Sequence, residues 1–286
     1  MTVAGLVWAG ISPLSAGEAL SGEEEGEEGL PGNGTSQGDA FPGGSGDGSI
    51  KDYLYKVRNP DTAFVDDLYL DQREMQLLQR VLERLNRLCA CVGDGNFSVL
   101  GFDEALGIAR RQESIGVFSS EELAFIEMLH SRDARDYGFF GTKPVNALTH
   151  RIDPADIVKV PSSGNYLFKG DSLEKYGRIR AVLGEDVILT SGIRGIVKQL
   201  SLFLNKARLH GGNLSLASRS LAPPGYSYHA VGDFDIGQKG FGVHNFTERF
   251  TSTSVYRELI ERGYIDNRYW RDNMLGVRYE PWHIKL

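Results

Sequence analysis

Residues Ser227 to Gly237, with the sequence SYHAVGDFDIG, form the stretch around which the C-terminal part of the chain is organised. The turn-forming residues APPG at 222–225 lead the chain into it. Gly232 lies between His229 and Asp235, and a tight reversal at this glycine would bring the two side chains to one point. An imidazole and a carboxylate held together in this way could bind a metal ion.

A second run, EPWH at residues 280–283, supplies the groups that the first stretch lacks. Catalytic zinc takes three nitrogen or oxygen ligands and keeps one position open. We therefore expect His229, Asp235 and His283 to be the metal ligands, with the third ligand contributed by a distant strand. Glu280 lies three residues before His283 and is expected to act as general base towards a metal-activated water, later passing the proton to a leaving amine.

The region around these motifs, residues 151–286, is predicted to form one domain in which short strands and helices alternate without a regular βαβ repeat. Helices are predicted at 171–183, 196–207 and 253–262, and strands at 187–190, at 214–216, near 264 and at 277–279. This order favours an α+β fold with a small, mostly antiparallel sheet and flanking helices.

A helical domain is predicted for residues 51–150, upstream of the motif-bearing region. Asp71 with Glu74 and Ser119 with Glu122 have the spacing of capping boxes, and each precedes an apolar stripe with helical period. A third helix is predicted from Asp103 to about Gln112. Apolar stripes of this kind need a partner surface, so the helices should pack on one another or on the next domain.

The first 50 residues differ in composition from the rest of the chain. They contain 13 glycines and eight acidic residues but no Lys or Arg, so we expect a disordered Gly/Glu-rich tail. Although the net charge of the whole chain is −7, residues 51–286 carry 31 basic and 30 acidic residues. This near-neutral balance provides no basic surface for nucleic acid.

Three further features bound the interpretation of the 286-residue chain. The sequence contains no run of 18 or more apolar residues, so no transmembrane segment is predicted. The mildly apolar start lacks the basic residues of a clear signal peptide. Cys89 and Cys91 are neighbours that point to different sides of a predicted helix, so we expect no disulfide between them. Their role stays open together with the oligomeric state.

Residues from about 187 to 286 resemble the zinc D-alanyl-D-alanine carboxypeptidases of the VanY type, which are relatives of the VanX dipeptidase and of the Hedgehog-type fold. The resemblance rests on three motifs in the family's order: Ser191-Gly192-Ile193-Arg194 with Gln199, Pro223-Pro224-Gly225-Tyr226-Ser227-Tyr228-His229 with Gly232, and Glu280-Pro281-Trp282-His283. The family places its aspartate seven positions after the first histidine, whereas Asp235 is six after His229. A one-residue deletion after Gly232 accounts for the difference, and Asp233 is the alternative ligand.

The resemblance implies a small antiparallel α+β fold and one zinc ion held by His229, Asp235 and His283, with Glu280 as base. It further implies that Arg194 stabilises an oxyanion or pairs with a terminal carboxylate. Ser191 and Ser227 are implied as substrate-contacting residues or as supports of the site.

The function that this resemblance implies is hydrolysis of peptidoglycan stem peptides, with removal of a terminal D-alanine as the first expectation. An L,D-carboxypeptidase or a wall endopeptidase with the same site is the alternative, and a non-catalytic zinc-stabilised cell-wall binding module is the alternative of another class. Such a substrate favours the cell envelope or periplasm, although a cytoplasmic location stays open because no clear signal peptide is present.

Overall fold

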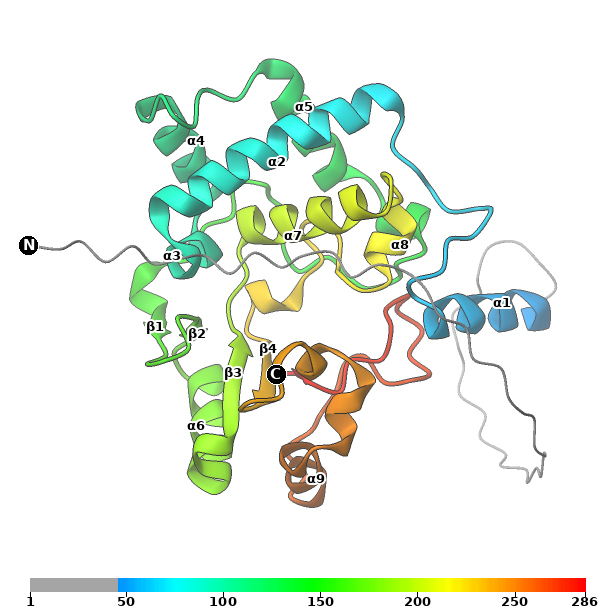
Figure 1. Ribbon diagram of the computed structural model, residues 1–286, viewed down its shortest axis with the longest axis vertical. Coiled ribbons are helices and arrows are strands. Elements are labelled where there is room, and N and C mark those ends of the chain that lie inside the picture. Colours follow the sequence, from blue (N-terminus) through cyan, green and yellow to red (C-terminus); the bar gives the residue numbers. More distant parts are fainter. Residues whose placement is uncertain (1–45) are drawn as a thin grey trace, which may run out of the picture. The chain divides into compact units, whose positions relative to one another are not determined.

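The computed structural model describes residues 46–286, and Figure 1 shows their course. The helices are α1 (Gly46–Arg58), α2 (Gln72–Val92), α3 (Asp94–Val99), α4 (Phe102–Arg111), α5 (Ser120–Ser131), α6 (Asp171–Leu183), α7 (Ile196–Leu209), α8 (Leu214–Ser218) and α9 (Ser254–Glu261). The strands are β1 (Ile157–Lys159), β2 (Tyr166–Phe168), β3 (Val187–Ser191), β4 (Phe234–Gln238) and β5 (His283–Ile284). Helix α1 begins inside the stretch that was expected to be a disordered tail; the remainder of that stretch, 1–45, lies outside the described residues.

Two of the helices begin at the capping boxes that the sequence predicted. The side chain of Asp71 accepts a hydrogen bond from the backbone of Glu74, and the Glu74 carboxylate accepts one from the backbone of Asp71. Ser119 and Glu122 repeat this exchange at the start of α5. Each box satisfies two amide groups that a helix start leaves without partners, which is why the local sequence is enough to set these boundaries.

The second half of the described chain contains a three-stranded antiparallel sheet with the order β3-β4-β5. Side chains alternate between its faces, and Phe234, Ile236 and Ile284 enter a core that α6 and α9 help to cover. A separate hairpin, β1-β2, is also antiparallel. The α+β class with small antiparallel sheets is therefore confirmed.

Leu214 and Leu216 do not form the strand that their alternation suggested. They belong to the short helix α8, and all five of its residues are buried. Asn213 decides the difference, because its side-chain oxygen accepts a hydrogen bond from the backbone of Leu216 at 2.8 Å and caps the helix start.

The strands predicted near Tyr264 and at Val277–Tyr279 are also wrong. The backbone amide of Tyr264 bonds to the carbonyl of Leu259 at the end of α9, 2.9 Å away. The amide of Arg278 bonds to the carbonyl of Arg219, 2.8 Å away, and not to a strand. Both segments satisfy these amides outside a sheet, so they are loops and not strands.

Helix α7 connects the helical region to the sheet. One face of α7 packs against α2, and its residues belong to the same apolar core as those of α2 and α5. The N-terminus of α7 follows directly after β3 and the loop 192–195. The described residues, 46–286, lie within one compact unit. The division into domains at residue 150 stays a prediction from the pattern of helices and strands in the sequence.

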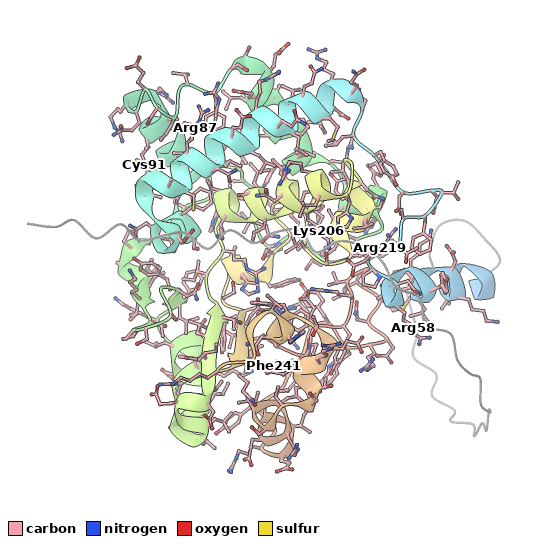
Figure 2. All side chains as sticks on the ribbon, in the orientation of Figure 1. Arg58, Arg87, Cys91, Lys206, Arg219 and Phe241 are labelled. Carbon is pink, nitrogen blue, oxygen red and sulfur yellow. The ribbon has the colours of Figure 1, made fainter. Side chains whose placement is uncertain are left out.

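Cys89 and Cys91, near the C-terminal end of α2, are both free; Figure 2 labels Cys91. No helix among the described residues is both long and apolar enough to cross a bilayer.

The shared core predicts a large stability cost for truncating α7 on its buried face. Leu204 is fully buried, so replacing it with alanine should lower the free energy of unfolding by about 2–5 kcal/mol. Leu209 lies on the same helix with 68% exposure, and L209A should change this free energy by less than about 0.5 kcal/mol. Urea unfolding of both variants measures the difference, and equal effects would contradict the packing of α7.

Candidate metal centre

The sheet places three polar residues in one row. Ser191 on β3 pairs with Asp235 on β4, and Asp235 pairs with His283 on β5. Directly opposed residues of antiparallel strands point to the same face, so these side chains gather on one side of the sheet. The apolar neighbours Phe234 and Ile284 point to the other side. The alternation of each strand thus separates the site from the core.

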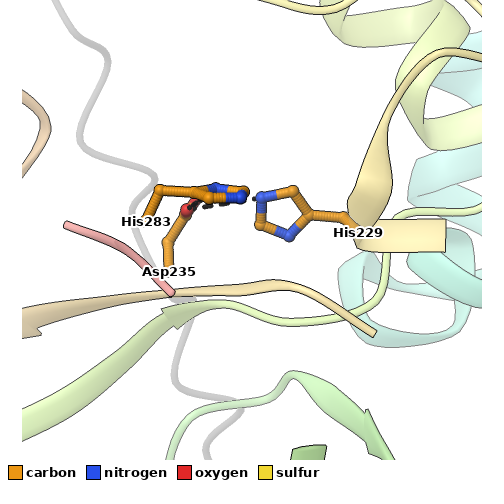
Figure 3. Close-up of side chains that lie close together, drawn as sticks. All are labelled: His229, Asp235 and His283. Atoms are coloured by element: carbon orange, nitrogen blue, oxygen red, sulfur yellow. Dashed lines mark hydrogen bonds and ion pairs between the residues drawn. The ribbon is translucent and has the colours of Figure 1, made fainter. Parts of the chain in front are cut away.

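His229 completes a cluster with Asp235 and His283 from outside the sheet (Figure 3). It lies in the short 3-10 helix Tyr228–Ala230. Its Nε2 atom is 3.3 Å from Asp235 Oδ1, and His283 Nδ1 is 3.1 Å from the same oxygen. One ligand atom from each residue lies within 4.8 Å of the other two. A tetrahedron with metal–ligand bonds of about 2.0–2.1 Å has edges of about 3.3 Å, so two of these separations already fit zinc.

Hydrogen bonds outside the cluster orient both imidazoles. His229 Nδ1 lies 2.8 Å from the carbonyl oxygen of Gly192, which can only accept, so this nitrogen carries the proton. On His283, Nε2 donates to Asp233 Oδ2 at 2.8 Å. The nitrogens that remain, His229 Nε2 and His283 Nδ1, both face Asp235. Two imidazoles ordered in this way by outer hydrogen bonds are typical of metal sites.

The charges around the cluster favour a cation at its centre. Burial opposes charge on His283, but the hydrogen bonds that its ring donates to Asp233 and Asp235 outweigh this effect and raise the pKa of His283 to about 9. Burial also opposes ionisation of Asp235, yet the neighbouring His229 and Arg194 hold the pKa of this carboxyl well below its usual range. Burial lowers the pKa of His229 and keeps it in the neutral form that binds metals. The donor set therefore fits a divalent metal such as zinc.

Asp233 plays a different part from Asp235. Its carboxylate binds His283 Nε2, pairs with Arg268 Nε at 2.9 Å, and accepts a hydrogen bond from the backbone of Leu286 at 3.0 Å. These partners use both carboxylate oxygens of Asp233, which lies on the side of His283 away from the cluster. The geometry favours Asp235 as the third ligand, with Asp233 as the acceptor that orients His283.

The cluster lies in the wall of a cavity of about 630 Å³, and the carboxylate of Glu280 lines the same cavity. Burial raises the pKa of Glu280 to about 7, despite the opposing charges of Arg278 and His283. A carboxyl with this pKa can accept and return a proton near neutral pH. Glu280 is the only acidic residue of the EPWH run, and it stays outside the three-residue cluster, as the sequence suggested.

Arg194, Ser191 and Ser227 also line this cavity. Arg194 Nε donates to Ser191 Oγ at 2.8 Å, and its Nη2 pairs with Asp235 Oδ2. Asp235 thus offers one oxygen to the histidines and the other to Arg194. Ser227 precedes the helix that carries His229.

The cavity also contains groups that the sequence did not single out. Its wall includes the positively charged side chains of Lys198, Lys206 and Arg278, and Figure 2 labels Lys206 on α7. One weak feature of the sequence could have singled out Arg278. It lies two residues before Glu280, and in an extended segment residues at this spacing can point to the same side. No sequence feature could have singled out Lys198 and Lys206, because the helical pattern does not tell which polar face lines a cavity.

Comparison with known proteins gives one family match. Residues 178–286 match the family model for VanY, D-alanyl-D-alanine carboxypeptidase. The match confirms, over these residues, the resemblance that the motifs indicated, and it indicates a hydrolase of the carboxypeptidase type. The comparison with curated proteins returned no match.

Three solved structures are similar to parts of the chain. One is the LD-carboxypeptidase LdcB, whose structure was described as revealing the molecular basis of peptidoglycan recognition. It shares 25% sequence identity with this chain at a TM-score of 0.38, and the match covers 47% of this chain and 69% of LdcB. The vancomycin-resistance D,D-pentapeptidase VanY from a VanB-type cassette, a mutant in complex with Zn(II), shares 23% identity and a TM-score of 0.38, with 51% and 86% covered. VanYB in complex with D-alanine-D-alanine shares 23% identity and a TM-score of 0.39, with 51% and 83% covered.

The geometry predicts different metal affinities for two aspartate variants. D233N removes only the charge that orients His283, so zinc affinity should fall by about 10–100-fold. D235N removes a charged ligand atom and should bind zinc more weakly than D233N. Calorimetric titration with zinc measures both, and D266N, at an exposed carboxylate near the C-terminus, should bind like the wild type. If D233N lost zinc while D235N kept it, the ligand assignment would be reversed.

Proposed function

We propose that this chain is a zinc-dependent carboxypeptidase that removes a terminal D-alanine from peptidoglycan stem peptides. The observation that carries the proposal is the convergence of His229 Nε2 and His283 Nδ1 on one oxygen of Asp235, in a cavity that the half-buried Glu280 also lines. The match of residues 178–286 to the VanY family supports the choice of substrate.

The three ligands would hold one zinc ion, with Asp235 using Oδ1. Zinc in such a site polarises the substrate carbonyl and makes water easier to deprotonate. Arg194 is fixed by Ser191 and Asp235, and its guanidinium lies in the cavity wall next to the ligands. A guanidinium held there stabilises negative charge on the carbonyl oxygen as the tetrahedral state forms.

Glu280 moves the proton in both halves of the reaction. Its carboxylate takes a proton from water as the water oxygen bonds to the carbonyl carbon. It then gives that proton to the nitrogen of the leaving amino acid as the carbon–nitrogen bond breaks. Partial burial raises its pKa to about 7, which favours both directions of transfer near neutral pH.

Replacing Glu280 separates metal binding from catalysis. E280Q should keep one zinc per chain, because Glu280 lies outside the ligand cluster, but should hydrolyse a peptide ending in D-Ala-D-Ala about 10²–10⁴-fold more slowly. Metal analysis and release of D-alanine measure the two properties. E261Q, at an exposed glutamate at the end of α9, is the matched control and should behave as the wild type.

Removing the metal tests the same proposal from the other side. A chelator should abolish hydrolysis by the wild type, and added zinc should restore it. Peptides with an L,D bond and with an internal bond serve as parallel substrates and decide among the related activities. A wild type that binds zinc and cleaves none of them would be a binding module and not an enzyme.

A further inference from the structure

Arg278 lies beside the proposed base and has donor capacity that the described residues do not use. Its Nε atom is buried and has no hydrogen-bond partner within the described part of the chain. The nearest Glu280 oxygen is 3.9 Å away, which is an ion-pair separation beyond hydrogen-bond distance. Arg278 also lines the cavity. A buried donor without a partner is costly, so this position is suited to a ligand that supplies an acceptor.

The guanidinium of Arg278 is held in place by other contacts. It lies over the ring of Trp282, 5.2 Å from the centroid, and its Nη2 donates to the carbonyl of Phe246 at 3.3 Å. The side chain is 26% exposed, so it is reachable from the cavity without being free in solvent. An arginine held in this way loses little further freedom when it binds an anion.

Arg194, the other arginine that lines the cavity, is already engaged. Its Nε and Nη2 groups bind Ser191 and Asp235. The sequence left two roles open for Arg194, stabilising an oxyanion or binding a terminal carboxylate. Its contacts next to the ligand cluster suit the first role, and Arg278 offers a donor for the second.

The geometry of the proposed reaction brings a terminal carboxylate to Arg278. Glu280 must come within about 3 Å of the leaving nitrogen to protonate it. In a terminal residue the carboxyl carbon is only two bonds from that nitrogen, with bond lengths of about 1.46 and 1.52 Å. The carboxylate of the leaving residue therefore lies close to whatever flanks Glu280. Arg278 Nε occupies such a flanking position.

We propose that Arg278 binds the free carboxylate of the substrate's terminal residue and thereby restricts the site to removal of one C-terminal amino acid. This inference rests on the proposed function. The guanidinium presents parallel N–H groups that match the two oxygens of a carboxylate. A chain that continues past the scissile bond has a neutral amide at this point, which leaves Arg278 without its anion.

The test compares one substrate in two forms, an N-acetylated tripeptide ending in D-Ala-D-Ala and its C-terminal amide. R278Q should lower kcat/KM for the free acid by about 10–100-fold, mainly through KM, and change kcat/KM for the amide by less than about 3-fold. R278K keeps the charge but not the fork and should fall between R278Q and the wild type. R271Q alters an arginine that packs on the neighbouring Tyr279 and pairs with Glu248, and it should match the wild type on both substrates.

Binding to the zinc-loaded E280Q protein separates this inference from the proposed function. Calorimetry should show about 10–100-fold weaker binding of the free-acid tripeptide to the double variant E280Q/R278Q than to E280Q alone, with no such difference for the amide. Absence of hydrolysis by the wild type would overturn the proposed function, while this binding difference would still support the carboxylate site. Equal losses for acid and amide, with wild-type circular dichroism, would overturn the role of Arg278.

Discussion

The carboxylate of Asp235 is the interaction on which the rest of the site depends. It is buried at the centre of the three-stranded sheet, where an unpaired charge would be strongly unfavourable. One of its oxygens faces His229 and His283, and the other pairs with Arg194. Each of these partners comes from a different segment, so a single carboxylate connects the loop after β3, the 3-10 helix before β4, and β5. The arrangement leaves two imidazole nitrogens directed at one point, where a divalent cation would balance the charge.

The sheet supplies the rigidity that such a point requires. The same period of two that directs Phe234, Ile236 and Ile284 into the apolar core directs Asp235 and His283 to the opposite face. Displacing the ligands would therefore also disturb the packing of the core. Asp233 adds a second restraint, because it fixes His283 from behind while Arg268 and the backbone of Leu286 hold Asp233 in turn. A functional group carried on strands and supported by outer hydrogen bonds keeps its geometry better than one on a loop.

Charge and burial divide the cavity into parts with different chemistry. Near the ligand cluster, Asp235 and Arg194 compensate each other, and His229 stays neutral through burial. At Glu280 desolvation dominates and raises the pKa of the carboxyl to about 7, although the positively charged Arg278 nearby opposes this shift. Lys198, Lys206, Arg194 and Arg278 line the cavity together with the acidic Asp94, Asp235 and Glu280, so charges of both signs face the same space.

Elements with local signals could be predicted before the fold was known. The capping boxes at Asp71 and Ser119 formed as predicted, because backbone amides there find side-chain partners three residues away. The apolar run leading to Ser191 also formed the predicted strand, although its partner strand β4 is distant in the sequence. The motif residues His229, His283 and Glu280 could also be singled out from spacing and chemistry. The folded structure was needed to show that Asp235 faces the histidines while Asp233 supports one of them, and that Val277–Tyr279 is not a strand. The deciding hydrogen bonds there come from residues distant in the sequence, such as the carbonyl of Arg219 for the amide of Arg278, and no short pattern records them. Leu214–Ser218 is different: its helix begins at a local cap by Asn213, which the alternation of Leu214 and Leu216 obscured.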